Sequence, residues 1–348
     1  MATGWRDGAI GQQKSNDAVI IVPGIMGSVL VDADSGEEIW NPSPGRLFGW
    51  LTPQARDTIE RLRVTDEELG GRVQRVKPAG LIQAPVWAPF LRGLMPYTGL
   101  IANLRRHPAL DATTPVVGFA YDWRLDIDSA ARRLGRTVAD CLQKWSGSAA
   151  ELRLREQTGH GEPGGVGIVA HSTGGLVVRS LLRMAAAGEL GPDSKTVAEG
   201  IRRIVTLGTP FHGSSKAVAM LARTSHAGRL RALFRTANGV GRVLDQLGHV
   251  AVTMPGIYDL LPDYPCIVDR HGAVRPLADR YLKSRGADAV LLAAARRRRT
   301  ANAATAMGCH SRVVGGGQPT PMLIDASSGA HVLTTYAVAF DAAGAGVG

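Results

Sequence analysis

The sequence has few cysteines and no long apolar run, and each shortage excludes a class of protein. Its 348 residues hold three cysteines, Cys141, Cys266 and Cys309, and this odd number at wide spacing predicts neither a disulfide framework nor a zinc site. No run of about eighteen apolar residues indicates a membrane-spanning helix. Residues 1–17 form a polar arm without the apolar centre of a signal peptide. We therefore expect a soluble, cytoplasmic protein without a metal centre.

The composition is that of a globular protein with a modest basic excess. Hydrophobic residues make up 45% of the chain, enough to bury a large core in one α/β domain or two smaller ones. The formal net charge of +10 would favour anionic partners, but the excess is scattered, so we expect no nucleic acid partner. The densest group, Arg296–Arg299, fits either a nucleic-acid or localisation patch or, as we favour, a solvated helix end.

Short β-branched segments that stop at turn residues are typical of buried parallel strands. Four segments have this pattern: Ala18–Val22, Val116–Ala120, Val166–Ala170 and Ile204–Leu207. Helical patterns alternate with them, most clearly over Leu176–Ala187 and Ser129–Trp145. The second of these places four residues on one face, Leu134, Val138, Cys141 and Leu142. The alternation predicts a parallel sheet covered by helices on both faces, with ligands bound at the carboxyl ends of its strands.

Two stretches interrupt this alternation and are interpreted as insertions into a single domain over residues 1–348. Residues 40–100 carry aromatic and proline residues that suit a cap or an apolar surface. Residues 211–310 are mostly helical by pattern and include a basic amphipathic section around Leu221, Leu230, Leu233 and Phe234. Either stretch fits a lid that opens at a lipid interface. Ordinary core-facing helices explain the second stretch equally well.

The hexapeptide AHSTGG, residues 170–175, places Ser172 between a predicted strand and a predicted helix. A nucleophilic serine at the end of a buried strand sits on a tight turn with small neighbours, usually as G-x-S-x-G. Here Ala170 and Gly174 occupy the two glycine positions, and the amide of Thr173 begins the helix, where it can donate to an oxyanion. We predict that Ser172 is a nucleophile rather than part of a chance Ser-Gly turn. His171 points elsewhere at such a turn, so we expect a structural role for it.

The loop PGIMGS, residues 23–28, follows the first predicted strand and is the expected source of a second oxyanion donor. Its proline ends strand pairing, and its two glycines permit unusual backbone angles. The amides of Ile25 and Met26 would then be free to point at a ligand. A plain turn is the alternative, but the presence of AHSTGG in the same chain favours an oxyanion hole.

Five segments taken in order resemble the lecithin:cholesterol acyltransferase family: VIIVPGIMGSVL, FAYDWR, GIVAHSTGGLVVRSLL, VTLGTPFHGS and VVGGGQPTP, between about residues 18 and 325. The resemblance implies the α/β-hydrolase fold, a mostly parallel doubly wound sheet with inserted cap or lid segments. It also implies a Ser-Asp-His enzyme that moves an acyl group from a lipid ester onto serine and then to an alcohol or to water. Its partners would be the lipid ester, the acceptor and, transiently, a membrane surface. It implies no cofactor, and the sequence has no G-x-G-x-x-G after a strand.

Residue by residue, the resemblance assigns Ser172 as the nucleophile and PGIMG as the loop of the oxyanion hole. Asp122 and Arg124 match a family signature below the site, where a buried ion pair would fix the loop. Phe211 and His212 follow the strand end that precedes the lid, so they would approach an acyl chain or the entrance of the site.

The carboxy-terminal part departs from the family pattern, which continues after a segment like VVGGGQPTP into a catalytic aspartate and a later histidine. Asp325 and His331 follow Ser172 in the required order, but they are six positions apart, too close for an acid and a base on successive strand ends. We therefore expect a chain that is incomplete at its carboxy terminus, with the acid and base beyond Gly348. Other late candidates are set aside because they lack a later partner, lie beside a strand or lie in the predicted lid: Asp341, His310, Asp259 and Asp263.

Two other functions stay open at this stage. A general carboxylesterase or lipase on the same fold would differ only in passing the acyl group to water. A non-catalytic lipid-binding or interaction module would explain why the acid and base are not found, but it would leave the serine turn unexplained.

Overall fold

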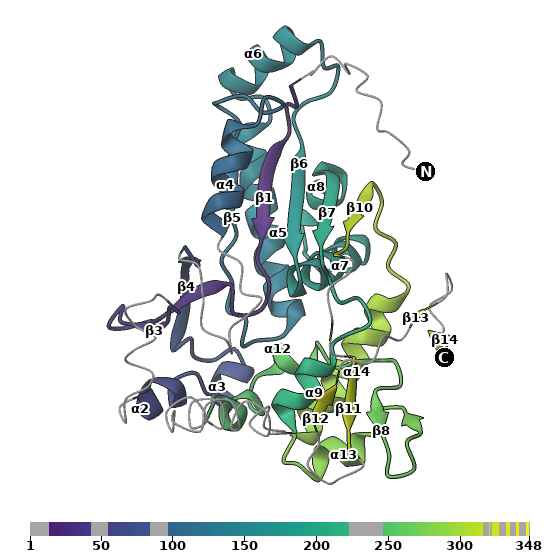
Figure 1. Cartoon of the computed structure of the whole chain (residues 1–348). Coiled ribbons are helices and arrows are strands. Elements are labelled where there is room, and N and C mark those ends of the chain that lie inside the picture. Colours follow the sequence, from purple (N-terminus) through teal and green to yellow (C-terminus); the bar gives the residue numbers. More distant parts are fainter. Residues whose placement is uncertain are drawn as a thin grey trace.

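A five-stranded parallel sheet crosses the computed structural model, which describes residues 14–42, 55–83, 97–222, 246–315, 320, 322–326, 332–334, 339–340 and 346–347 (Figure 1). The strands, in spatial order, are β10 (His310–Val313), β7 (Ile201–Leu207), β6 (Val166–His171), β1 (Ala18–Val22) and β5 (Val116–Gly118). Every pairing in this sheet is parallel. The predicted α/β fold with a parallel sheet is therefore confirmed.

The four predicted strands are all present, with shifted ends. β5 ends at Gly118, two residues earlier than predicted, although the N–H of Phe119 still donates to the carbonyl of Ile21 at 2.8 Å. β7 begins at Ile201, three residues earlier than predicted. Strand ends depend on the neighbouring strand for their hydrogen bonds, so the local sequence fixes them least well.

Helices cover both faces of the sheet, as predicted. On β1 the side chains alternate: Ala18, Ile20 and Val22 join the larger hydrophobic core, whereas Val19 and Ile21 join a smaller one. Among the helices that contribute to the larger core are α5 (Ile127–Trp145), α7 (Thr173–Ala186) and α8 (Asp193–Gly200). The smaller core is closed by α4 (Tyr97–Arg106). A short helix, α6 (Ala149–Thr158), follows α5.

The predicted apolar face of α5 is confirmed. Leu134, Val138, Cys141 and Leu142 are all buried. Asp126 caps the helix by accepting a hydrogen bond from the N–H of Ser129 at 2.9 Å, as aspartate does at the N-cap position.

The described part of the first region interpreted as an insertion, residues 40–100, forms a small layer together with strands that precede it in the chain. An antiparallel sheet joins β3 (Glu38–Trp40), β2 (Ser28–Asp32) and β4 (Val76–Leu81). Two short helices, α2 (Ala55–Glu60) and α3 (Asp66–Leu69), lie between β3 and β4 in the chain.

Helices outnumber strands in the described part of the second region, 211–310, in line with its predicted helical pattern. Its helices are α9 (Ser215–Leu221), residues 246–251, α12 (Pro255–Tyr258), α13 (Asp279–Lys283) and α14 (Ala289–Ala303). Its strands β8 (Ile267–Val268) and β9 (Val274–Arg275) join β11 (Leu323–Asp325) and β12 (Val332–Thr334) in a second sheet. Strand pairs this short are stabilised by tertiary packing rather than by a sequence pattern. Of the predicted amphipathic section, Leu221 is buried in α9, and Leu230, Leu233 and Phe234 lie outside the described residues.

Figure 1 shows most of these elements beyond the carboxyl ends of the parallel strands. Two further short strands, β13 (Ala339–Phe340) and β14 (Gly346–Val347), pair with each other near the end of the chain. In the part of the chain that the structure describes, no helix has the length and apolar character needed to cross a membrane.

The cluster Arg296–Arg299 in α14 was predicted to be a solvated helix end, and the structure corrects this prediction. Three of its members pair with carboxylates: Arg296 with Asp279 at 3.1 Å, Arg298 with Asp259 at 2.8 Å, and Arg299 with Asp263 at 3.0 Å. The cluster thus joins α14 to α13, through Asp279, and to the segment after α12, through Asp259 and Asp263.

Candidate active site

The turn from β6 into α7 places Ser172 in a strained backbone conformation. β6 ends at His171 and α7 begins at Thr173, and Ser172 between them has φ 52° and ψ −124°. A non-glycine residue at such angles costs about 1–3 kcal/mol and persists where the surrounding structure holds it. One such restraint is the hydrogen bond from the N–H of Ser172 to the carbonyl of Leu207 at 2.9 Å. The half-buried side chain thus stands at the carboxyl edge of the sheet.

Close packing explains why the residues around this turn are small. A Cβ atom on Gly174 would lie 2.6 Å from the carbonyl oxygen of Val22 and 2.7 Å from that of Pro23. Both distances are shorter than Cβ contacts in real structures, so α7 could not approach β1 with a larger residue there. Ala170, in the other position usually filled by glycine, is completely buried.

The PGIMGS loop lies directly against the nucleophile. A Cβ atom on Gly24 would lie 2.9 Å from Cβ of Ser172. The N–H of Gly27 donates to the carbonyl of Gly24 at 3.0 Å, and Met26 has φ 61°, so the four residues form a tight turn. Within the described residues, the N–H groups of Ile25 and Met26 donate to no protein acceptor.

The helix α7 supplies the amide of Thr173 at its first position, where the N–H has no acceptor inside the helix. Thr173 is buried, and the helix N-terminus carries a partial positive charge. The turn therefore brings three predicted donors, Thr173, Ile25 and Met26, to the neighbourhood of Ser172.

The FAYDWR segment supports the loop from below. The hydroxyl of Tyr121 donates to the carbonyl of Pro23 at 3.1 Å, and its N–H donates to Oγ of Ser28 at 3.1 Å. The indole of Trp123 donates to the carbonyl of Ser28 at 3.3 Å. Both ends of the PGIMGS loop are thus fixed by one segment that lies about a hundred residues later in the chain.

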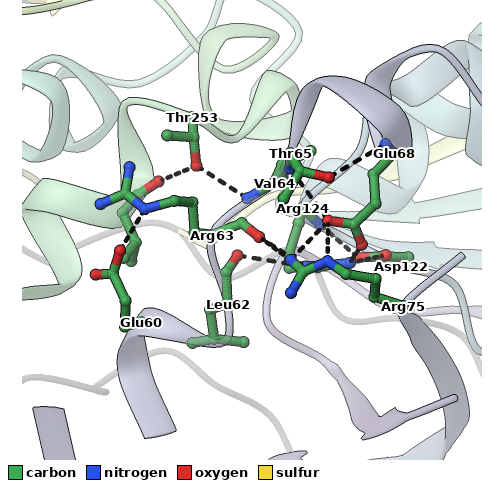
Figure 2. Close-up of polar contacts among 11 residues, drawn as sticks. Glu60, Leu62, Arg63, Val64, Thr65, Glu68, Arg75, Asp122, Arg124 and Thr253 are labelled. Atoms are coloured by element: carbon green, nitrogen blue, oxygen red, sulfur yellow. Dashed lines mark hydrogen bonds and ion pairs between the residues drawn. The ribbon is translucent and has the colours of Figure 1, made fainter. Parts of the chain in front are cut away.

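Asp122 and Arg124 form a bidentate ion pair within this segment, with distances of 2.9 and 2.7 Å (Figure 2). The Arg124 side chain is fully buried and also pairs with Glu68 of α3 at 2.8 Å. Burial acts to lower the pKa of Arg124, but the two carboxylates outweigh it and raise the pKa above the usual arginine value. The pair thus links the segment below the site to the first inserted region.

Glu68 has a second role at the start of α3. Its carboxylate accepts the N–H of Thr65 at 3.1 Å, completing a capping box, and it also pairs with Arg75 at 2.8 Å (Figure 2). Burial acts to raise the pKa of Glu68, yet Arg124 and Arg75 together hold it below the ordinary glutamate value. The sequence interpretation missed this ion pair because Glu68 lies 56 residues from Arg124, and its capping-box motif marks a helix start rather than a distant partner.

His171 lies half-buried beside the loop and hydrogen-bonds Tyr97. Its Nδ1 lies 2.9 Å from the Tyr97 hydroxyl, which also accepts the N–H of Gly24 at 2.8 Å. Burial lowers the pKa of His171, so its imidazole is neutral near pH 7. The sequence interpretation did not single out Tyr97, which lies at the start of α4.

Phe211 and His212 are adjacent in sequence but contact different parts of the protein. The ring of Phe211 meets His310 edge-on, with Arg179 and Arg312 over it at 5.2 and 5.5 Å. His212 is 79% exposed, and its Nδ1 lies 3.1 Å from Asp263. His212 therefore faces solvent and Asp263, and no described contact joins it to Ser172.

The described residues do not include an identifiable acid and base for Ser172, because no described histidine forms a hydrogen bond with it. His310 faces the Thr206 hydroxyl at 2.8 Å. Asp325 belongs to β11 in the second sheet, and His331 and Asp341 lie outside the described residues.

Asp259 is buried and accepts the N–H of Ile127 at 2.9 Å, and burial raises its pKa to about 6. No group of three potential metal-ligating side chains occurs in the described ranges.

Comparisons with known proteins find matches to parts of the chain. Residues 97–238 match the family described as Lecithin:cholesterol acyltransferase. The uncharacterized protein YJR098C of Saccharomyces cerevisiae is 28% identical over 167 residues, which are 47% of this chain and 20% of the yeast protein. The chain thus spans about a fifth of the length of this curated relative.

Two solved structures are similar at low sequence identity. "The crystal structure of Tle4-Tli4 complex" matches with 17% identity and a TM-score of 0.48, over 86% of this chain and 74% of the other. "Phospholipase PlaB from Legionella pneumophila" matches with 18% identity and a TM-score of 0.23, over 72% of this chain and 36% of the other.

Proposed function

We propose that this chain, whose residues 97–238 belong to the lecithin:cholesterol acyltransferase family, transfers acyl groups from a lipid ester through Ser172 to an alcohol or to water. One observation carries the proposal: a serine with φ 52° stands at the carboxyl edge of a parallel sheet, against a loop whose Ile25 and Met26 amides donate to no acceptor among the described residues. A strained serine beside unpaired N–H groups suits nucleophilic acyl transfer.

In the first half-reaction, Oγ of Ser172 attacks the ester carbonyl carbon while an imidazole takes the hydroxyl proton. The carbonyl oxygen becomes an oxyanion, which the N–H of Thr173 and that of Ile25 or Met26 stabilise. The imidazole then gives its proton to the departing alcohol oxygen, leaving an acyl ester on Ser172. We assign this imidazole to the part of the protein that the structure does not describe.

In the second half-reaction, an acceptor hydroxyl gives its proton to the imidazole and attacks the acyl carbonyl carbon. The bond from that carbon to Oγ then breaks, and the imidazole returns the proton to Ser172. Each amide of the oxyanion hole is worth about 10²–10³ in rate in enzymes of this type, so the placement of the PGIMGS loop decides the activity. No step calls for a cofactor.

The two inserted regions, 40–100 and 211–310, are proposed as the cap or lid of a single domain, because the described part of 211–310 lies mostly beyond the carboxyl ends of the strands (Figure 1). A cap at that position would shelter the acyl chain and make transient contact with a membrane surface. Phe211 follows β7 at the same edge and is proposed to contact the acyl chain.

A fluorophosphonate probe tests the nucleophile directly, because it phosphonylates an activated serine. We expect labelling of the wild-type protein at Ser172, none for Ser172→Ala, and unchanged labelling for Ser284→Ala, which removes an exposed hydroxyl of α13's C-cap. Labelling that persists in Ser172→Ala would refute the assignment. Absence of labelling in a protein that still binds phosphatidylcholine vesicles would favour a non-catalytic lipid-binding module.

The acceptor is tested by supplying phosphatidylcholine vesicles with and without a long-chain alcohol. Formation of the alkyl ester at the expense of free fatty acid indicates acyltransferase activity. Free fatty acid alone, at a rate that the alcohol leaves unchanged, indicates a lipase.

A further inference from the structure

We propose that Tyr97 is a positioning residue, whose hydroxyl sets the distance between the oxyanion loop and the nucleophile. The inference rests on the proposed function, and it adds a residue to the machinery of the same site. Tyr97 hydrogen-bonds Gly24 of the loop and His171, the residue that precedes Ser172.

The Tyr97 side chain is held rigidly in this position. It is the first residue of α4, is 2% exposed and belongs to the smaller hydrophobic core. Its N–H donates to the carbonyl of Ile82 at 3.3 Å, and its ring meets that of His171 edge-on with centroids 6.0 Å apart. A hydroxyl on so fixed a ring can act as a spacer between the two segments that it joins.

Chemistry decides the direction of the two hydrogen bonds. A backbone N–H can only donate, so the hydroxyl accepts from Gly24 and has its own proton for Nδ1 of His171. Burial raises the pKa of Tyr97 to about 12 and lowers that of His171, which keeps the hydroxyl protonated and the imidazole neutral. The imidazole then carries its proton on Nε2. The Tyr97 hydroxyl accepts one hydrogen bond and donates the other.

Removing the hydroxyl would leave two buried polar groups without a partner. In Tyr97→Phe, the N–H of Gly24 and Nδ1 of His171 would each lose their hydrogen bond, and the loop would have to move to find another. Gly24 is also where the loop touches the nucleophile, since a Cβ atom there would lie 2.9 Å from Cβ of Ser172. A shift of the loop therefore changes the distance between the oxyanion donors and Oγ, and a misplacement of about 1 Å can cost about 10²-fold in rate.

The test compares Tyr97→Phe with Tyr258→Phe. Tyr258 is a matched control because its buried hydroxyl also accepts a backbone N–H, that of Asp288 at 2.8 Å, and donates to the carbonyl of Val252 at 2.7 Å. Tyr258 contacts neither the PGIMGS loop nor Ser172 among the described residues. We expect Tyr97→Phe to slow fluorophosphonate labelling of Ser172 by about 10- to 100-fold and Tyr258→Phe to leave it within about twofold.

Two NMR measurements read the same geometry without any chemistry at Ser172. Ring ¹⁵N shifts should show His171 as the Nε2–H tautomer in the wild type, and Tyr97→Phe should change the Nδ1 shift. The amide of Gly24 should exchange with solvent at least tenfold faster in Tyr97→Phe than in Tyr258→Phe.

The outcomes separate this inference from the proposed function. Labelling of Tyr97→Phe at the wild-type rate overturns the inference and leaves the function standing. If the wild type does not label at all, the function fails, and the amide exchange of Gly24 decides the inference: faster exchange in Tyr97→Phe supports the positioning role, and equal exchange overturns it.

Discussion

Replacing Arg124 by methionine should destabilise the protein far more than the same change at an exposed arginine. The guanidinium of Arg124 is completely buried and contacts Asp122 at 2.9 and 2.7 Å and Glu68 at 2.8 Å. Methionine has similar length and no charge, so the change leaves the buried carboxylate of Asp122 without its arginine and leaves Glu68 with Arg75 as its remaining cation. Breaking a buried pair by removing one partner costs about 3–5 kcal/mol.

Arg61 offers the matched control. It also pairs with two carboxylates, Asp32 at 3.0 Å and Glu37 at 2.7 Å, but its side chain is 33% exposed. Water can solvate the carboxylates when Arg61 is replaced by methionine, so we expect a loss of about 0–1 kcal/mol. The two variants therefore differ in burial and share the same change in charge and shape.

Thermal unfolding measures this difference directly. At about 2.1 cal/mol/K per residue, a chain of 348 residues unfolds with an entropy of about 0.7 kcal/mol/K. A loss of 3–5 kcal/mol then lowers Tm by about 4–7 °C for Arg124→Met, against about 1 °C or less for Arg61→Met.

The pH dependence provides a second check with a fixed sign. The pKa of Glu68 is held below its ordinary value in the folded protein, so the stability it contributes is present above the unfolded pKa and is lost as pH falls through the folded pKa. The penalty for Arg124→Met should therefore shrink as pH falls below the ordinary glutamate pKa of 4.5. A Tm loss no larger than that of Arg61→Met, or a penalty that grows on acidification, would refute the reasoning.

Two further predictions follow from close contacts and burial. Gly24→Ala should reduce labelling of Ser172 by more than tenfold, because the added Cβ would lie 2.9 Å from Cβ of Ser172, whereas Gly80→Ala, with no atom within 4 Å of the added Cβ, should label normally. Asp259 has its pKa raised to about 6 by burial, so its contribution to stability is fully present below the unfolded pKa of 3.8 and is lost as pH rises through about 6. Urea unfolding should therefore show Asp259→Asn gaining on the wild type by up to about 3 kcal/mol between pH 4 and 7, and a pH-independent difference would contradict this.

Local patterns identified the elements around Ser172 because the physical constraints there are themselves local. A β-branched run followed by AHSTGG specifies a strand, a turn with small residues and a helix within a single stretch of chain, and β6 and α7 lie where the pattern placed them. The apolar face of α5 was predictable for the same reason, since helical spacing alone places its four core residues together.

Local sequence patterns did not predict the contacts of side chains whose partners lie far away in the sequence. Solvation was the expected state of Arg296–Arg299, but acidic residues from α13 and from the segment after α12 pair with three of these arginines. Phe211 and His212 were grouped because they are adjacent in sequence, yet the first packs among Arg179, His310 and Arg312 and the second faces Asp263. Charge and adjacency in a sequence do not say which surface a residue will meet.

The sequence by itself determined four strands of the parallel sheet, two of its helices, the position of the serine turn and the loop predicted to present amides, because strand alternation, turn chemistry and small residues act over a few positions. Only the tertiary structure decided that Tyr97 joins Gly24 to His171 and that Glu68 meets Arg124. These contacts span 73, 74 and 56 residues. They form only after the parallel sheet has brought its carboxyl ends together, since buried polar groups must then find partners among whatever segments surround them.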